Sequence, residues 1–193
     1  MEIKHEAMEK AARVRLLIFD VDGVLTDGGI YMGEAGEVFK PFNCKDGLGI
    51  TLAHRAGLLT AIITGRTSVQ LLRRAGELHI TELMQGQMDK RSAYGSLKEK
   101  YGLRDEEIAY LGDDLIDLPV MLQVGLPVAV ADASPEVRDI AALVTEKTGG
   151  HGAARELIEF ILKAQGRWQA LIAPFYDTET PCNVAQPEAS VAQ

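Results

Sequence analysis

Two acidic side chains follow a short apolar run near the N-terminus. In LLIFDVD, residues 16–22, Asp20 comes directly after four apolar residues and Asp22 comes two positions later. Residues two apart in an extended chain point to the same side, so both carboxylates can face one point. Neighbouring carboxylates repel each other, and a divalent cation such as Mg²⁺ relieves that repulsion. The pair alone is equally well explained by a turn cap and a solvated side chain, so other residues must decide.

A second acidic cluster favours a metal site. In IAYLGDDLID, residues 108–117, another apolar run ends in Asp113 and Asp114, and Asp117 follows. Ligands of open α/β sheets bind beyond the carboxyl ends of the strands. If the two apolar runs form adjacent parallel strands, five carboxylates crowd one edge of the sheet. A purely structural role explains such crowding poorly, whereas a metal site explains it well.

Groups that suit a phosphate follow two further apolar runs. IITGR, residues 62–66, ends in Thr64, Gly65 and Arg66, and Lys90 lies just ahead of a predicted helix. A hydroxyl and a glycine amide can donate hydrogen bonds to a phosphate oxygen, and an ammonium can neutralise a phosphate or a crowded carboxylate. Each of these residues alone has an ordinary structural explanation, as the end of a strand or the solvated start of a helix.

Taken together, these residues describe a site for phosphoryl transfer. An aspartate attacks phosphorus and forms an acyl phosphate, which divides one difficult step into two. Mg²⁺ screens the repulsion between carboxylate and phosphate. A second aspartate protonates the leaving oxygen and then activates water.

The elements that must position these residues predict an α/β fold. Strand-like runs alternate with helix-like segments, which is typical of a Rossmann-like three-layer α/β/α sandwich around a central parallel sheet. Asp46 and Ser134 occupy expected helix N-caps, with Pro135 at a first helical position. The predicted strands cover residues 16–19, 59–63, 80–84, 108–111, 127–130 and 143–145, and the predicted helices cover residues 47–56, 68–77, 92–101, 118–124, 135–140 and 153–164.

One segment interrupts the alternation. Residues 28–43, GGIYMGEAGEVFKPFN, predict a β-hairpin around the turn GEAGE, and the motif spacing leaves no room for a separate cap domain. The apolar hairpin residues do not all fit on one face, which favours burial between subunits over folding back on the chain's own core. We expect a single domain over residues 1–166, with the hairpin as its insertion, and a flexible C-terminal extension over residues 167–193.

Composition and charge exclude several classes of partner. The chain has 193 residues, is 47% hydrophobic and carries a formal net charge of -8, which argues against nucleic acid and anionic membranes. No apolar run is long enough to span a bilayer, and the charged N-terminus does not resemble a signal peptide. Its two cysteines, Cys44 and Cys182, form no disulfide framework, so we expect a cytoplasmic protein with reduced thiols.

The motifs DVDGVLTDG, ITGR, DK and GDDLID resemble, in this order, the four motifs of the haloacid dehalogenase superfamily. The resemblance implies that Asp20 is the nucleophile and Asp22 the general acid/base. It implies that Thr64 and Lys90 hold the phosphoryl group, and that Mg²⁺ binds Asp20, Asp113 and the backbone carbonyl of Asp22.

The same resemblance gives the remaining acidic residues supporting roles. Asp114 and Asp117 are expected to bind metal-bound water or to orient Lys90. The dehalogenases of the superfamily lack the acid/base aspartate, so the presence of Asp22 favours a phosphatase.

A narrower similarity covers about residues 15–162. DVDGVLTDGGIY, KPFNCKDGLGI and GGHGAARE are similar to a capless subgroup whose members release phosphate from an eight-carbon sugar acid during lipopolysaccharide synthesis. The subgroup forms homotetramers through its hairpins, and each subunit helps to close a neighbour's site. A substrate with a carboxylate requires further cations, for which Arg66, Lys45 and Arg155 are the candidates, the last two in their own or a neighbouring site.

Three other functions remain open from the residues alone. The substrate could be another sugar phosphate, such as a nine-carbon sialic-acid-type phosphate. The fold could serve a non-catalytic binding protein, although the retained Asp20 and Asp22 argue against it. An open site could also act on proteins or nucleic-acid ends, and the acidic charge disfavours the latter.

Overall fold

The core of the molecule is a parallel sheet. The computed structural model describes the backbone of residues 2–34 and 36–179. Within these residues a six-stranded sheet has the order β5-β4-β1-β6-β7-β8, and all its neighbouring strands are parallel. The strands are β1 (Leu16–Phe19), β4 (Leu59–Ile63), β5 (Glu82–Met84), β6 (Ile108–Gly112), β7 (Leu126–Ala129) and β8 (Leu143–Val144).

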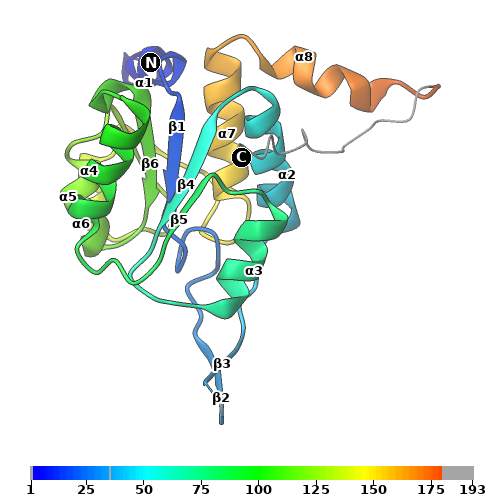
Figure 1. Ribbon diagram of the computed structural model, residues 1–193. Coiled ribbons are helices and arrows are strands. Elements are labelled where there is room, and N and C mark those ends of the chain that lie inside the picture. Colours follow the sequence, from blue (N-terminus) through cyan, green and yellow to red (C-terminus); the bar gives the residue numbers. More distant parts are fainter. Residues whose placement is uncertain (1, 35, 180–193) are drawn as a thin grey trace.

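Helices cover both faces of this sheet, as Figure 1 shows. One layer contains α4, α5 and α6, and the other contains α2, α3 and α7. Because both faces are covered, β1 and β6 are buried along their whole length, which explains their unbroken apolar runs. The helices are α1 (Glu2–Ala12), α2 (Cys44–Arg55), α3 (Val69–Glu77), α4 (Lys90–Tyr101), α5 (Leu118–Met121), α6 (Pro135–Ile140), α7 (Ala153–Ala164) and α8 (Trp168–Ile172).

The predicted hairpin forms and projects away from the three layers (Figure 1). It consists of the antiparallel strands β2 (Tyr31–Gly33) and β3 (Gly36–Phe39). The rings of Tyr31 and Phe39 stack with their centroids 4.4 Å apart. The apolar side chains of Ile30, Met32 and Val38 are exposed, so the hairpin does not fold back on the core of its own chain.

The three-layer fold with a central parallel sheet and a hairpin insertion is therefore confirmed, whereas several boundaries differ. The strand expected over 80–84 is limited to β5, and the helix expected over 118–124 is limited to α5. The helix expected over 47–56 begins earlier, at Cys44. The sequence analysis did not predict α1, which is rich in charged residues, or α8.

Two predicted N-caps have different outcomes. Asp46 does not cap α2; Asn43 does, because its side chain accepts a hydrogen bond from the Lys45 amide. Asp46 instead accepts a 2.7 Å hydrogen bond from the amide of Arg155, in the first turn of α7. Ser134 is the N-cap of α6 as expected, although its side chain makes no capping bond.

The end of the chain is only partly described. The extension expected over 167–193 begins with α8, and Trp168 packs against the core. The expected flexibility of residues 180–193 concerns a segment outside the described residues, as does Cys182. No helix in the described part of the chain has the length and apolar character needed to cross a membrane.

Candidate active site

The strand order brings the predicted motifs to one edge of the sheet. β1 lies between β4 and β6, with Phe19 in register with Ile62 on one side and Leu111 on the other. The residues that follow these strands, among them Asp20 and Asp113, therefore emerge side by side. This adjacency of β1 and β6 is the condition that the sequence analysis set for a shared acidic site.

Lys90 is the buried centre of this edge. Its ammonium lies 2.8 Å from Oδ1 of Asp20 and 2.6 Å from Oδ1 of Asp117, and its side chain is fully buried. The hydroxyl of Tyr110, on β6, lies 3.0 Å from the same ammonium and donates a 2.6 Å hydrogen bond to Asp117. Burial lowers the pKa of Lys90, but the charges of Asp20 and Asp117 outweigh this effect and raise it. Lys90 is therefore a cation in the site.

Asp117 has both carboxylate oxygens committed to the protein. Oδ1 faces Lys90 and Tyr110, and Oδ2 accepts hydrogen bonds from the amides of Asp113 (2.9 Å) and Asp114 (3.3 Å). Such a carboxylate orients its neighbours. This arrangement places Asp117 as a support beside Lys90, whereas Asp114 is exposed and its side chain caps the following turn by accepting from the amides of Leu115 and Asp117.

Asp20 and Asp113 are the donors left for a metal ion. Carboxylate oxygens of Asp20, Asp113 and Asp117 all lie within 4.8 Å of one another, and Oδ1 of Asp113 is buried without a hydrogen-bond partner. Burial and the charge of Asp117 raise the pKa of Asp20 to about 7, and burial and the charges of Asp20 and Asp117 raise that of Asp113 to about 8. These raised pKa values show that the two carboxyl groups are difficult to ionise side by side. A divalent cation bound between them would remove that difficulty.

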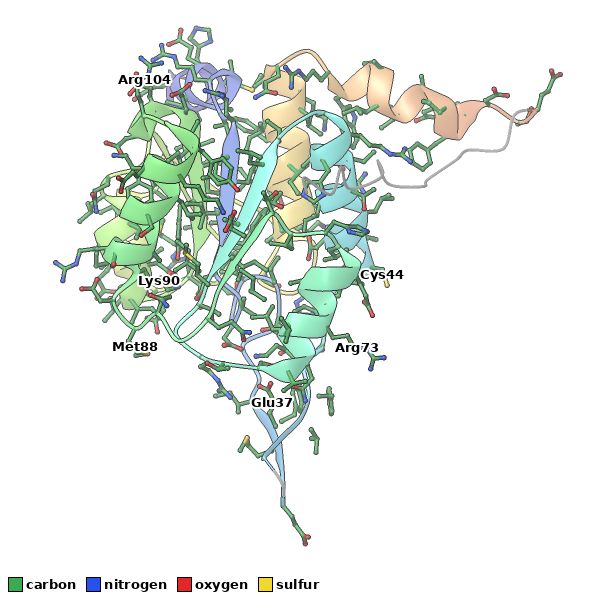
Figure 2. All side chains as sticks on the ribbon, in the orientation of Figure 1. Glu37, Cys44, Arg73, Met88, Lys90 and Arg104 are labelled. Carbon is green, nitrogen blue, oxygen red and sulfur yellow. The ribbon has the colours of Figure 1, made fainter. Side chains whose placement is uncertain are left out.

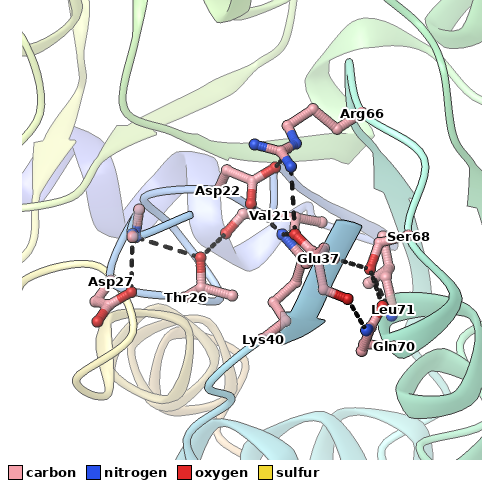
Figure 3. Close-up of polar contacts among 12 residues, drawn as sticks. Val21, Asp22, Thr26, Asp27, Glu37, Lys40, Arg66, Ser68, Gln70 and Leu71 are labelled. Carbon is pink, nitrogen blue, oxygen red and sulfur yellow. Dashed lines mark hydrogen bonds and ion pairs between the residues drawn. The ribbon is translucent and has the colours of Figure 1, made fainter. Parts of the chain in front are cut away.

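Asp22 lies in a second network of charges (Figure 3). Its carboxylate forms an ion pair with Lys40, and Nε of Arg66 lies 3.9 Å from it. Glu37 of β3 lies behind these cations, with Oε1 3.3 Å from both the Lys40 ammonium and the Arg66 guanidinium. Burial raises the pKa of Glu37, but hydrogen bonds from Ser68 and Lys40 and the adjacent positive charges lower it overall.

The predicted phosphate-binding residues Thr64 and Gly65 follow β4, next to β1. Thr64 is buried, its amide bonds the carbonyl of Met84, and its carbonyl accepts the Gln87 amide. A Cβ on Gly65 would meet the sulfur of Met88 at 2.9 Å, a contact that this exposed and flexible side chain can relieve by moving. The ends of β4 and β5 are thus joined beside Asp20.

Two predicted substrate-binding cations lie elsewhere. Lys45 is exposed on α2 and Arg155 is on α7, and both line a hollow of about 570 Å³ that contains none of the acidic residues at the sheet edge. Arg155 binds Glu159 at 2.8 Å and covers the ring of Trp168. The described part of the chain therefore does not bring Lys45 and Arg155 to the acidic cluster.

The Gly-rich segment that contains Arg155 has a different role in the structure. Gly149 lies so close to the loop after β1 that a Cβ would approach the Gly23 carbonyl oxygen to 1.7 Å. The Gly150 amide donates to the carbonyl of Val24 at 2.9 Å. Gly23 itself has a φ of +89°, and a Cβ there would meet Asp113 at 2.1 Å. These glycines allow three loops to meet around Asp20.

Sequence reasoning missed Lys40, Glu37 and Tyr110. Lys40 and Glu37 belong to the hairpin segment, which the sequence marked only by its apolar residues. Tyr110 lies inside an apolar strand and reads as a core residue. The signal available in the sequence was Lys40 itself, a cation that directly follows a predicted hairpin strand. In the structure this cation faces the acidic site.

Comparisons with known proteins agree with this geometry. Residues 59–157 match the model of the haloacid dehalogenase-like hydrolases. The chain is 50% identical over 165 residues to the 3-deoxy-D-manno-octulosonate 8-phosphate phosphatase KdsC of Escherichia coli, covering 86% of this chain and 88% of that protein.

Solved structures are similar as well. The crystal structure of the 3-deoxy-D-manno-octulosonate 8-phosphate phosphatase of Yersinia pestis has a TM-score of 0.84 and 51% identity, over 85% of this chain and 89% of that one. That of the Moraxella catarrhalis phosphatase, in complex with magnesium ion, phosphate ion and KDO, has a TM-score of 0.86 and 42% identity, over 89% and 98%. The fold, the ordered motifs and these relatives together establish that the chain belongs to the haloacid dehalogenase-like hydrolase family.

Proposed function

We propose that this protein is a Mg²⁺-dependent phosphatase that hydrolyses 3-deoxy-D-manno-octulosonate 8-phosphate to the free sugar acid and phosphate. The observation that carries the proposal is the buried contact of Lys90 with Asp20 at the edge shared with Asp113. It occurs in a chain that is 50% identical to a phosphatase of this substrate. We place the enzyme in the cytoplasm, in the synthesis of a lipopolysaccharide precursor.

In the first step, Asp20 attacks phosphorus and the bond from phosphorus to the sugar oxygen breaks. Asp22 gives its proton to that oxygen, so the sugar leaves as an alcohol. In the second step, Asp22 takes a proton from water while the water oxygen attacks the phosphorus of the aspartyl phosphate. Phosphate then leaves, and the carboxylate of Asp20 is restored.

The remaining residues hold the reactants. Lys90 neutralises the phosphoryl oxygens and keeps Asp20 oriented, and Thr64 donates a hydrogen bond to the same group. Asp20, Asp113 and the backbone carbonyl of Asp22 hold Mg²⁺. When bound, the ion offsets the repulsion between the attacking carboxylate and the phosphate.

The sugar end of the substrate carries a carboxylate. Arg66 is half-exposed beside Asp22, and its guanidinium can pair with that group. Lys45 and Arg155 lie away from the site of their own chain, so we assign them to the site of a neighbouring subunit. The exposed apolar hairpin provides the contact between subunits in a homotetramer, and residues 1–166 form the catalytic domain.

Phosphate release from a panel of sugar phosphates, with Mg²⁺ and with EDTA, tests this function. We expect release from the eight-carbon acid phosphate that EDTA abolishes. Preferred turnover of a nine-carbon sialic-acid-type phosphate would keep the chemistry and change the substrate. No phosphate release from any member of the panel would favour a non-catalytic binding protein and overturn the proposal.

A further inference from the structure

A buried lysine from the hairpin segment holds the carboxylate of Asp22. Lys40 follows β3 directly, and its side chain is only 1% exposed. Its ammonium forms ion pairs with Asp22 and with Glu37, as Figure 3 shows. Two of the three N–H donors of the Lys40 ammonium face these carboxylates, and the side chain is almost closed to solvent. Lys40 therefore acts on Asp22, and its contact with a substrate is excluded by its burial.

The position of Lys40 is fixed from the other side by α3. Oε2 of Glu37 accepts a 2.5 Å hydrogen bond from the Ser68 hydroxyl, at the N-cap of α3. The side-chain amide of Gln70 donates to the backbone carbonyl of Glu37 at 2.9 Å. Figure 2 labels Glu37 at the end of the molecule from which the hairpin projects. The base of the hairpin is thus tied to the rigid domain and, through Lys40, to Asp22.

The two cations near Asp22 differ in their access to solvent. The Arg66 side chain is 37% exposed and lies 3.9 Å from Asp22, whereas Lys40 is in direct contact and buried. Both cations also pair with Glu37 at 3.3 Å, so what separates them is exposure: Arg66 is open to a ligand, whereas Lys40 is enclosed beside Asp22. Of these two cations, Lys40 is the one placed to hold Asp22 throughout a catalytic cycle.

We propose that Lys40, supported by Glu37, is a positioning residue that holds Asp22 in line with the leaving oxygen for proton transfer. The proposal deepens the phosphatase function proposed above and rests on it. Without Lys40, Asp22 can rotate away from the leaving group, while Asp20 and Lys90 remain in place for the attack on phosphorus.

This role predicts a dependence on the leaving group. A poor leaving group needs the proton from Asp22, whereas p-nitrophenolate leaves without it. The constant kcat/KM includes only the steps up to departure of the leaving group, so later hydrolysis of the aspartyl phosphate does not enter it. Substituted phenyl phosphates are of similar size and carry no sugar, so a general loss of binding lowers kcat/KM equally across the series.

The experiment measures kcat/KM for phenyl, p-chlorophenyl and p-nitrophenyl phosphate in wild type and Lys40→Met. We expect a loss on the order of 100-fold for phenyl phosphate and of less than about 5-fold for p-nitrophenyl phosphate. Lys40→Arg should restore most of the wild-type dependence. Lys10→Met is the matched control: among the described residues Lys10 forms an ion pair with Glu6 alone, on the surface of α1, so its loss should change nothing.

The ratio between substrates is measured on one sample, so it does not depend on the fraction of folded enzyme. If Lys40→Met does not fold, Glu37→Gln tests the same role. We expect it to change the ratio of kcat/KM between phenyl and p-nitrophenyl phosphate by a few-fold in the same direction. An equal loss for all leaving groups, or no loss, would overturn the proposal. Failure of wild type to release phosphate from the sugar acid phosphate would instead concern the proposed function.

Discussion

The acidic cluster and the hairpin differ in how far their own chain covers their side chains. In the cluster, Lys90 and Asp117 are fully buried, and each faces a group of opposite charge in the same chain. On the hairpin, the apolar side chains of Met32 and Phe39 are each more than half exposed, and Tyr31 stacks only on Phe39. Asp20 of the cluster and the hairpin both follow β1 in the sequence, yet only the cluster has its side chains covered by the described part of its own chain.

This difference indicates that the strand ends carry the reaction, whereas the hairpin serves to enclose the site through contacts with a partner. The groups that we assign to the reaction are positioned by four strand ends of one chain, which requires no partner. The hairpin presents an apolar surface that the chain itself leaves uncovered, which is characteristic of an interaction site. Lys40 and Glu37 join the two regions, so a contact that shifts the hairpin acts directly on Asp22.

Loss of the nucleophile is expected to have the largest effect on the cluster. Asp20→Asn keeps the shape of the side chain and removes the attacking carboxylate, so phosphate release should fall by about 10⁴-fold or more. A phosphate-release assay at saturating substrate measures the loss. Wild-type turnover in this variant would show that the acidic cluster does not carry the reaction.

Removal of the buried support is the next largest change. Asp117→Ala leaves the Lys90 ammonium buried with one carboxylate fewer and removes the acceptor of Tyr110. We expect the free energy of unfolding to fall by about 3–5 kcal/mol. Urea denaturation at pH 7 measures it.

Asp114→Ala is the matched control for that prediction. Asp114 is exposed, and its side chain caps a single turn by accepting from the amides of Leu115 and Asp117, so its loss should cost about 1 kcal/mol or less. Equal losses in the two variants would contradict the distinction between a buried support and a surface cap.

On the hairpin, a charge should affect assembly and leave the domain intact. Phe39→Asp places a carboxylate on the exposed apolar surface. We expect the mass from light scattering to fall from that of a tetramer to that of a smaller species. Because the side chain is largely exposed, the free energy of unfolding of the domain should change by about 0.5 kcal/mol or less. If the wild-type protein were a monomer in solution, the proposed assembly through the hairpin would be wrong.

Much of the fold could be predicted because the central strands are buried on both faces. Such strands leave continuous apolar runs, and β1, β4 and α7 have the predicted bounds. The charge-rich α1 was missed because, among residues 5–12 of this helix, only Ala7 and Ala11 are buried, which leaves no clear apolar stripe there. Local spacing also misplaced Asp46, because its partner in α7 is 109 positions away.

The part of the candidate site that could be predicted consists of reactive side chains that directly follow predicted strands. Asp20, Lys90 and Asp113 could be grouped because parallel strands share one edge. The contact of Lys40 with Asp22 could not, because it depends on how the hairpin segment turns back toward β1. The separation of Arg155 from the cluster likewise depends on the packing of α7, which no local pattern records.

The central claim is that Asp20 and Asp113 crowd together because they share a divalent cation. Without the ion, the raised pKa of Asp113, about 8, means that the folded state keeps a proton that the unfolded state has lost above about pH 4. The metal-free protein should therefore lose stability as pH rises from about 4 to about 8. Asp113→Asn should remove part of this loss and raise the free energy of unfolding at pH 8 by about 2 kcal/mol or more.

The direct measurement is the thermal midpoint of wild type and Asp113→Asn at pH 8, each with EDTA and with saturating Mg²⁺. We expect the variant to be the more stable protein in EDTA and the less stable one in Mg²⁺, because the ion stabilises only a site that keeps both carboxylates. The same order of stability in both conditions, or no effect of Mg²⁺ on wild type, would contradict a shared cation site.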